Sequence, residues 1–196
     1  IVAGGYSSVC ITGPLLYMIG RNVLNKPKPK SLGVTAIWFN PLFESAWVDG
    51  GYDIIDFYKV DPRFGTNDDL VRLIELAHKR GIKVLLDLVA GHTSDKCPWF
   101  LQSAQGTNLH YSDYYIWSDR LPDAKAEREL EEMMKDPNYM QSNVGKWMKS
   151  TYPRDKFYCK NFYACQPALN FGYADPDPSR PWEQGVDAPG PRAVRQ

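Results

Sequence analysis

The stretch Asp87-Leu88-Val89-Ala90-Gly91-His92 ends an apolar run that begins at Lys83, and this run decides the fold class. Residues 83–89 carry aliphatic side chains at adjacent as well as alternating positions, which is typical of a parallel strand buried on both faces. In α/β barrels, the polar groups that carry chemistry lie at the carboxyl ends of such strands. A carboxylate kept in a core strand for structural reasons alone is costly without a partner. The pattern therefore favours a functional role for Asp87 and His92.

A strand and a helix precede this stretch and complete a βαβ unit. The β-branched, apolar run Val34–Phe39 predicts a strand that ends at Asn40-Pro41. Thr66 followed by acidic residues predicts a helix start, and Lys79-Arg80-Gly81 predicts its end. Strand, helix and strand of these lengths indicate a parallel sheet covered by helices, and therefore an α/β protein.

The sequence changes character after His92. Residues 93–173 are aromatic and polar and contain no second strand–helix–strand pattern. Residues 124–135 predict a surface helix with a solvated charged face, residues 174–191 carry five prolines and predict a loop, and residues 191–196 predict the start of a helix. Near the N-terminus a helix is expected between the first two strands, although Pro27 and Pro29 conflict with a helix there.

The composition excludes some partners and leaves others open. The 196 residues carry 23 basic and 23 acidic side chains, so no attraction to nucleic acid or to a membrane surface is expected. No stretch is long and apolar enough to span a bilayer. The 12 Tyr, 8 Phe and 6 Trp fit either an aromatic core or a surface that stacks on sugar rings. The four cysteines lack a zinc spacing and predict free thiols or one bridge between Cys159 and Cys165, so the cellular location stays unknown.

Five blocks of this sequence resemble successive blocks of the α-amylase family of glycoside hydrolases (glycoside hydrolase family 13). The similarity runs from about residue 32 to residue 196 and keeps the order of the family's blocks. The blocks are Leu32-Gly33-Val34-Thr35-Ala36-Ile37-Trp38-Phe39-Asn40-Pro41, Gly51-Tyr52-Asp53-Ile54-Ile55-Asp56-Phe57-Tyr58, Asp61-Pro62-Arg63-Phe64-Gly65-Thr66, Asp87-Leu88-Val89-Ala90-Gly91-His92 and Gln166-Pro167-Ala168-Leu169-Asn170. Five blocks in one order are far more specific than any single motif.

The resemblance implies a (β/α)8 TIM barrel with an irregular domain inserted after the third strand. Residues 34–39 are then barrel strand two and residues 83–89 are strand three. The implied division is an N-terminal part of the barrel at 1–92, an inserted domain (domain B-like) at 93–173, and a return linker with the start of the next barrel helix at 174–196. Three strands cannot close a barrel. We therefore expect exposed strand edges, poor solubility of the 196-residue chain alone, and a need for the remaining part of the barrel.

The resemblance also assigns roles to four residues. Tyr52 matches the tyrosine that stacks on the sugar ring at the cleavage subsite, although it could instead be a core tyrosine. His92 matches the histidine that hydrogen-bonds a hydroxyl of that sugar, and Asp87 matches a carboxylate that orients the site, commonly through an arginine on strand four. Asp49 lies where exo-acting glucosidases hold the non-reducing end of the substrate. An aspartate before Gly50-Gly51 is explained equally well as a turn residue.

Two positions depart from the family's pattern. Gly91 replaces an asparagine that is a calcium ligand in many amylases, and glycine has no side-chain oxygen for a hard cation. We therefore expect no metal at this position, no cofactor, and an activity that survives chelation. Ala168 replaces an acidic residue that is often present in the later block.

The implied function is hydrolysis or transfer at α-glucosidic bonds of an α-linked oligo- or polysaccharide, by a retaining mechanism. That mechanism needs two carboxyl groups about 5–5.5 Å apart, a nucleophile and an acid/base. The family carries both in later blocks, and its Gly-x-Arg-x-Asp nucleophile block does not occur in these 196 residues. Nothing in the spacing indicates that Asp49 and Asp87 form a substitute pair. We expect the 196-residue chain alone to be inactive.

A non-enzymatic alternative stays open. The family includes members that lost these carboxylates and serve as carbohydrate-binding modules or as partner proteins. A natural reading frame that continues through a Gly-x-Arg-x-Asp block would indicate an enzyme. The N-terminal Ile1-Val2-Ala3-Gly4-Gly5 resembles that of trypsin-like proteases, but the serine and histidine settings that those enzymes need are absent from the sequence.

Overall fold

The computed structural model describes residues 2–3, 6–11, 34–107 and 109–196, which form two compact units. We call residues 1–45 and 56–88 the sheet unit, and residues 46–55 and 89–196 the loop unit. The division at 1–92, 93–173 and 174–196 remains a prediction about domains. The compact units follow other boundaries, because residues 46–55 and 174–196 both belong to the loop unit.

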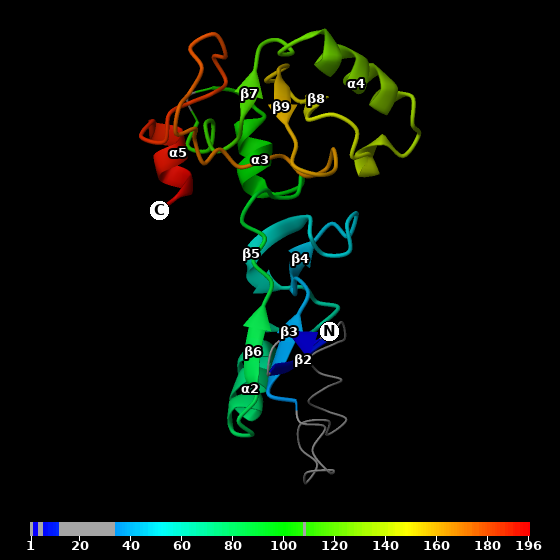
Figure 1. Cartoon of the computed structure of the whole chain (residues 1–196), viewed down its shortest axis with the longest axis vertical. Coiled ribbons are helices and arrows are strands. Elements are labelled where there is room, and N and C mark those ends of the chain that lie inside the picture. The colour runs from blue at the N-terminus through cyan, green and yellow to red at the C-terminus, as the bar shows by residue number, and fades with distance from the viewer. Residues whose placement is uncertain (1, 4–5, 12–33, 108) are drawn as a thin grey trace. The chain divides into compact units, whose positions relative to one another are not determined.

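The sheet unit is built on a mostly parallel sheet (Figure 1). Its strands are β1 (Val2–Ala3), β2 (Tyr6–Ile11), β3 (Ala36–Phe39) and β6 (Lys83–Leu86), in the order β1-β2-β3-β6. β1 is antiparallel to β2, whereas β2, β3 and β6 are mutually parallel. The predicted parallel strands are therefore confirmed, and the described residues form no closed barrel.

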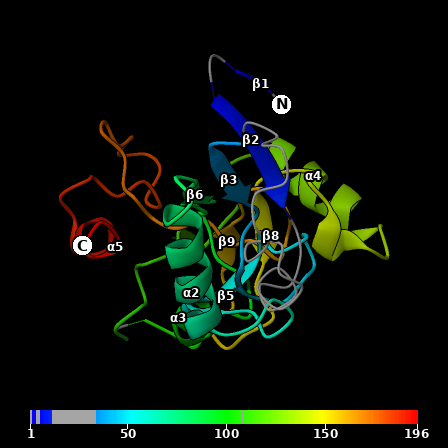
Figure 2. The same cartoon turned by 90° about the horizontal axis from the view of Figure 1, so that it is seen from below.

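One helix covers part of this sheet. α2 (Asn67–His78) runs alongside β6, as Figures 1 and 2 show. Thr66 caps its start: the side-chain oxygen accepts from the Asp69 backbone N–H while the Asp69 carboxylate accepts from the Thr66 N–H, which is a capping box. The helix buries Leu70, Leu73 and Ala77 against the unit, and the predicted helix is confirmed.

The prediction of a strand buried on both faces is wrong for β6. Leu85 is 48% exposed and Leu86 is 38% exposed, and Trp38 of the neighbouring β3 is 45% exposed. The physical reason is that the described residues cover the faces of this sheet only in part: α2 packs on β6, and Trp38 on the internal strand β3 is nearly as exposed as Leu85 on the edge strand. β6 also ends at Leu86, so Asp87 lies directly after the strand, where its backbone N–H donates to the Phe39 carbonyl at 3.2 Å.

A second, small sheet follows β3 along the chain. β4 (Phe43–Ser45) pairs with β5 (Ile54–Val60), and the rings of Phe43 and Phe57 lie 6.5 Å apart. Asp61 is buried after β5. Its carboxylate accepts from the backbone N–H groups of Ser45 and Arg63, which joins the ends of the two strands.

The loop unit contains short elements around an aromatic core. They are α3 (Pro98–Ser103), β7 (Trp117–Ser118), α4 (Ala124–Met134), the 3-10 helix η1 (Tyr139–Gln141), β8 (Trp147–Lys149), β9 (Phe157–Cys159) and α5 (Pro189–Val194). β9 pairs antiparallel with both β7 and β8. Phe100 is fully buried, and its ring contacts those of four other aromatic residues, namely Tyr115, Trp117, Tyr152 and Tyr158.

The structure tests three further predictions for this unit. The surface helix is confirmed as α4, which Asp123 caps and which lies beside β8 (Figure 1). Residues 174–188 contain no helix or strand, and the last helix begins at Pro189, earlier than predicted, because proline is tolerated in a first helical turn. Cys97, Cys159 and Cys165 are free thiols, which excludes the bridge.

Two further predictions concern a helix near the N-terminus and membrane-spanning segments. The helix between the first two strands falls at residues outside the described part of the chain. Among the helices that the structure does describe, none has the length and apolar character needed to cross a membrane.

Candidate functional site

A cavity of about 370 Å3 in the loop unit brings together three of the four predicted site residues. Its lining residues are Asp49, Tyr52, His92, Asn143, Phe162 and Tyr163. A volume of this size falls within the usual range of small-molecule sites, which combine apolar walls with a few polar groups. The cavity has that composition, because three aromatic rings share it with a carboxylate, an imidazole and an amide.

A tight turn carries Asp49 and Tyr52 to the cavity. The Tyr52 backbone N–H donates to the Asp49 carbonyl at 2.8 Å, and Gly50 and Gly51 adopt φ angles of 56° and 106°. Residues with a Cβ rarely adopt such angles, so the two glycines are what allow the turn. The fully buried Asp53 fixes it from within, since its carboxylate accepts from the backbone N–H groups of Val48 and Asp49 at 3.0 and 3.1 Å. Asp49 is thus both a turn residue and a cavity residue.

His92 is the buried polar group of the cavity. It is 3% exposed, and its ring Nε2 lies 3.0 Å from the Tyr52 carbonyl oxygen. Its Nδ1 lies 3.1 Å from the side-chain nitrogen of Asn161, and the Phe162 ring meets it edge-on at 5.8 Å. Burial lowers the pKa of His92 below its usual value; the Tyr52 carbonyl and the charges of Asp49 and Asp53 oppose this shift. The imidazole is therefore neutral near pH 7.

The segment 159–170 holds this arrangement from the other side. Backbone hydrogen bonds pair residues 91–93 with residues 167–169, including Leu169 N–H to the Gly91 carbonyl at 3.1 Å. Gln166 is fully buried, and its side-chain nitrogen donates to the Asp49 carboxylate at 2.7 Å. The side-chain oxygen of Gln166 accepts from the Tyr163 backbone N–H, and the backbone carbonyl of Gln166 accepts from the Asn161 backbone N–H. One glutamine thus links the Asp49 turn to the segment that contacts His92.

Asp87 belongs to the sheet unit and is not among the lining residues. Gly91 lies beside the cavity residues, and a Cβ on it would come within 2.8 Å of the Asn161 side-chain nitrogen. Within the described ranges, no three His, Cys, Asp or Glu side chains are grouped so that they could hold a metal ion.

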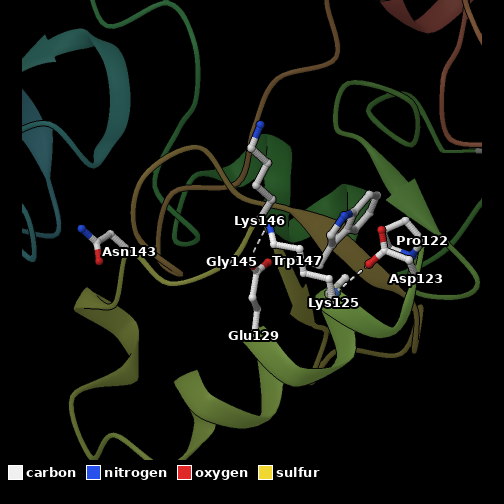
Figure 3. A pocket seen from close by; sticks show the side chains of 9 residues that line it. Pro122, Asp123, Lys125, Glu129, Asn143, Gly145, Lys146 and Trp147 are labelled. Atoms are coloured by element: carbon white, nitrogen blue, oxygen red, sulfur yellow. Dashed lines mark hydrogen bonds and ion pairs between the residues drawn. The ribbon is translucent and has the colours of Figure 1, made fainter.

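A second cavity of about 380 Å3 lies along α4 and β8 (Figure 3). Two of its acidic groups are already engaged: Lys125 extends over Glu129, with 3.1 Å between their charged atoms, and Asp123 accepts from the Ala126 backbone N–H. Trp147 is 8% exposed and packs edge-on against Trp182, so its ring faces are not free for a ligand. We therefore regard the cavity around His92 as the candidate site.

The sequence patterns did not identify several residues of the site. Gln166 stood inside one of the five recognised blocks, so its location was predictable although its contact with Asp49 was not. Asn161, Phe162 and Asn143 carried no signal, because each is brought to the cavity by long-range folding across the loop unit. Chemically, the cavity offers ring faces and both hydrogen-bond donors and acceptors, which fits a ligand with hydroxyl groups on a compact ring.

Comparison with known proteins gives consistent matches. Residues 29–177 match the family model "Alpha amylase, catalytic domain". The chain is 41% identical over 145 residues to the trehalose synthase/amylase TreS of Mycolicibacterium smegmatis, a match that covers 72% of this chain and 22% of that protein. It is 47% identical over 142 residues to alpha-amylase 3 of Dictyoglomus thermophilum, covering 72% and 24%.

The solved structures agree with these matches. The crystal structure of Bacillus licheniformis trehalose-6-phosphate hydrolase is similar with a TM-score of 0.66 and 30% identity, over 85% of this chain and 30% of that one. The chain thus spans about a quarter of the length of the curated relatives it matches.

Proposed function

Because the chain belongs to the alpha-amylase catalytic-domain family, we propose that it supplies the glucose-binding part of an enzyme that cleaves or transfers α-glucosidic bonds by a retaining mechanism. The observation that carries this proposal is the convergence of Asp49, Tyr52 and His92 on one cavity. The relatives that the chain resembles are named as an amylase, a trehalose synthase and a trehalose-6-phosphate hydrolase, all enzymes of α-glucosides.

Tyr52 and Asp49 would contact the sugar directly. Tyr52 is half-buried and lines the cavity, so one ring face can pack against the C–H groups of a glucose unit. The Asp49 carboxylate has one oxygen bonded to Gln166 at 2.7 Å, and a carboxylate has further lone pairs that can accept from sugar hydroxyls. The aspartate would hold the non-reducing end of the substrate.

His92 would act in two ways. Its Nε2 is bonded to the Tyr52 carbonyl, so the imidazole positions the backbone of the stacking residue. To donate to a sugar hydroxyl, the same N–H has to share its proton between the Tyr52 carbonyl and the sugar. A neutral imidazole suits this role, because it needs no counter-charge from a neutral substrate.

Asp87 would orient the reacting groups from the end of the parallel sheet. Polar residues that follow parallel strands share one edge of a sheet, and Asp87 comes directly after β6. We propose that β2, β3 and β6 are strands one to three of the family's (β/α)8 barrel, and that residues 93–173, which lie within the loop unit, are the domain inserted after strand three. The nucleophile and the acid/base would come from the remaining part of the barrel.

The experiment uses the protein encoded by the complete natural reading frame. Initial rates are measured with p-nitrophenyl α-D-glucopyranoside and its β anomer, and the anomeric form of the first product is followed by NMR. We expect turnover of the α anomer alone, release of α-glucose first, and the same rate after EDTA treatment. Turnover of the β anomer would contradict the proposal, and a loss of activity with EDTA would contradict the metal-free site.

One result would favour the non-catalytic alternative instead. If maltose binds to the complete protein but neither anomer is turned over, the chain belongs to a carbohydrate-binding module or partner protein. If maltose does not bind at all, the assignment of the cavity to a sugar is wrong.

A further inference from the structure

We propose that Asn161 is a positioning residue for His92, and that the missing side chain of Gly91 provides the space in which the Asn161 amide lies. Asn161 lies in the loop after β9, far in sequence from His92, and its side-chain nitrogen is 3.1 Å from His92 Nδ1. The role of the pair in catalysis rests on the proposed function, whereas its effect on the imidazole does not.

The hydrogen bonds around the ring define a single tautomer. A backbone carbonyl oxygen can only accept, so the contact of Nε2 with the Tyr52 carbonyl at 3.0 Å requires a proton on Nε2. A neutral imidazole has one ring proton, which leaves Nδ1 as an acceptor. The amide NH2 of Asn161 is the group that donates to it. The ring is therefore fixed with Nε2–H toward the Tyr52 turn.

The groups that face the ring explain why a donor is needed at Nδ1. Asp49 and Asp53, both on the segment that carries Tyr52, favour the protonated imidazolium. The segment after β9 brings the Asn161 amide and the edge of the Phe162 ring to the imidazole, neither of which carries charge. A carboxylate at position 161 would add a third negative charge and would place a proton on Nδ1.

Gly91 is the steric counterpart of this contact. A Cβ on Gly91 would lie 2.8 Å from the Asn161 side-chain nitrogen, and real Cβ atoms do not approach so closely. Both backbones are tied, since the Gly91 carbonyl accepts from Leu169 and the Asn161 N–H donates to Gln166. The amide is the freest of these groups to move. Any side chain at position 91 is thus expected to push the amide away from His92.

The test reads the imidazole by 15N NMR in the protein of the complete reading frame, labelled at histidine, with His92→Gln to assign the signals. Wild type should show Nε2 protonated and Nδ1 unprotonated at pH 7. In Asn161→Ala, Nδ1 loses its donor and water can accept from it, so part of the population should carry the ring proton on Nδ1 while the Tyr52 carbonyl alone favours Nε2–H. Asn161→Asp should raise the pKa of His92 by about one unit or more, a tenfold change in its protonation constant. Asn161 is an exposed residue, so these variants are expected to fold.

Glycine variants supply the matched comparison. Gly91→Ala should reproduce the tautomer mixture of Asn161→Ala, and adding it to Asn161→Ala should change nothing further, because the amide it would displace is already gone. Gly106→Ala is the control, since a Cβ there meets no atom within 4 Å. A wild-type His92 protonated on Nδ1, or an unchanged tautomer in both Asn161→Ala and Gly91→Ala, would overturn the proposal. If Gly91→Ala fails to fold, the wild-type tautomer and Asn161→Asp still decide it.

An activity measurement separates this proposal from the proposed function. If the protein acts on α-glucosides, kcat/KM should fall about tenfold in Asn161→Ala and Gly91→Ala and stay unchanged in Gly106→Ala. A wild-type protein without α-glucosidase activity would refute the proposed function and leave the tautomer results intact. An active protein whose kcat/KM is unaffected by both variants would refute the positioning role.

Discussion

The two units of this chain bury their apolar side chains to different extents. A smaller share of the loop unit is helix or strand, yet its core is closed: Phe100 is fully buried among aromatic rings, and Gln166 and Asp53 are fully buried with hydrogen-bond partners. The sheet unit has the more regular elements, yet Trp38, Leu85 and Leu86 on its parallel strands are 38–48% exposed. A high content of helix and strand therefore does not mean that a unit buries its apolar side chains. The loop unit holds its site residues by hydrogen bonds within the unit, whereas the sheet unit presents apolar side chains that suit a further partner segment.

The largest effect should come from the aromatic core. Phe100→Ala should lower the free energy of unfolding by about 3–5 kcal/mol, because it removes a fully buried ring and leaves a cavity among four other rings. Urea unfolding of the complete protein measures it. Leu109→Ala, at a position that is 43% exposed, is the control. Equal costs for the two variants would show that the loop unit is not closed around Phe100.

The second-largest effect is expected at Leu85 on β6, an apolar side chain that the sheet unit leaves partly exposed. If the remaining part of the barrel covers β6, Leu85→Ser should cost about 2–4 kcal/mol in the complete protein, although Leu85 is 48% exposed in the 196-residue chain. The control is Val71→Ser on the exposed face of α2, where the cost should stay within about 0.5 kcal/mol. A Leu85→Ser cost as small as that of the control would mean that nothing covers this strand.

A smaller effect is expected at the glutamine that joins the turn to the segment after β9. Gln166→Ala should cost about 1–3 kcal/mol, because the Asp49 carboxylate and the Tyr163 N–H each lose a buried partner. Gln166→Glu should cost more, since it brings a second carboxylate to within hydrogen-bond distance of Asp49. Thermal unfolding compares both with Gln105→Ala at an exposed site. If Gln166→Glu were as stable as wild type, the contact with Asp49 would not exist in solution.

The smallest effect concerns pH. Burial lowers the pKa of His92 in the folded state, so the unfolded chain takes up this proton first as the pH falls below about 6.5. The contribution of His92 to stability is therefore complete above that pH and is lost as the pH falls toward the lower, folded-state value. Urea unfolding at pH 7.5 and pH 5.5 should show a weaker pH dependence for His92→Gln than for wild type. His110→Gln, at an exposed position, should keep the wild-type dependence.

Local patterns predicted the sheet unit well. Thr66 and Asp69 predicted the helix start, and the apolar run after Gly81 predicted the parallel strand, because capping and side-chain periodicity depend on near neighbours. The exposure of the Leu85 side chain could not be predicted from neighbouring residues. The burial of a strand depends on the segments that pack against it. The apolar pattern of β6 indicates a covered strand whether or not the covering segment belongs to the described residues.

The candidate site was predictable in its conspicuous residues and not in its supports. Tyr52 and His92 were named from their sequence blocks and Asp49 from its position before Gly50-Gly51, and the structure brings all three to one cavity. Asn161 was not foreseeable, because an asparagine in an irregular loop has no local signature and its contact with His92 arises from pairing across the loop unit. The exclusion of a Cβ at Gly91 likewise depends on that distant side chain.

We propose that the cavity of the loop unit binds the sugar at the reacting bond. The most direct test is kcat/KM for p-nitrophenyl α-D-glucopyranoside with Tyr52→Ala in the complete protein, beside Tyr58→Ala, whose ring is 80% exposed in the sheet unit. We expect kcat/KM to fall by about 10²-fold or more, or roughly 3 kcal/mol of transition-state stabilisation, in Tyr52→Ala alone. Equal kcat/KM values for Tyr52→Ala, Tyr58→Ala and wild type would contradict this proposal.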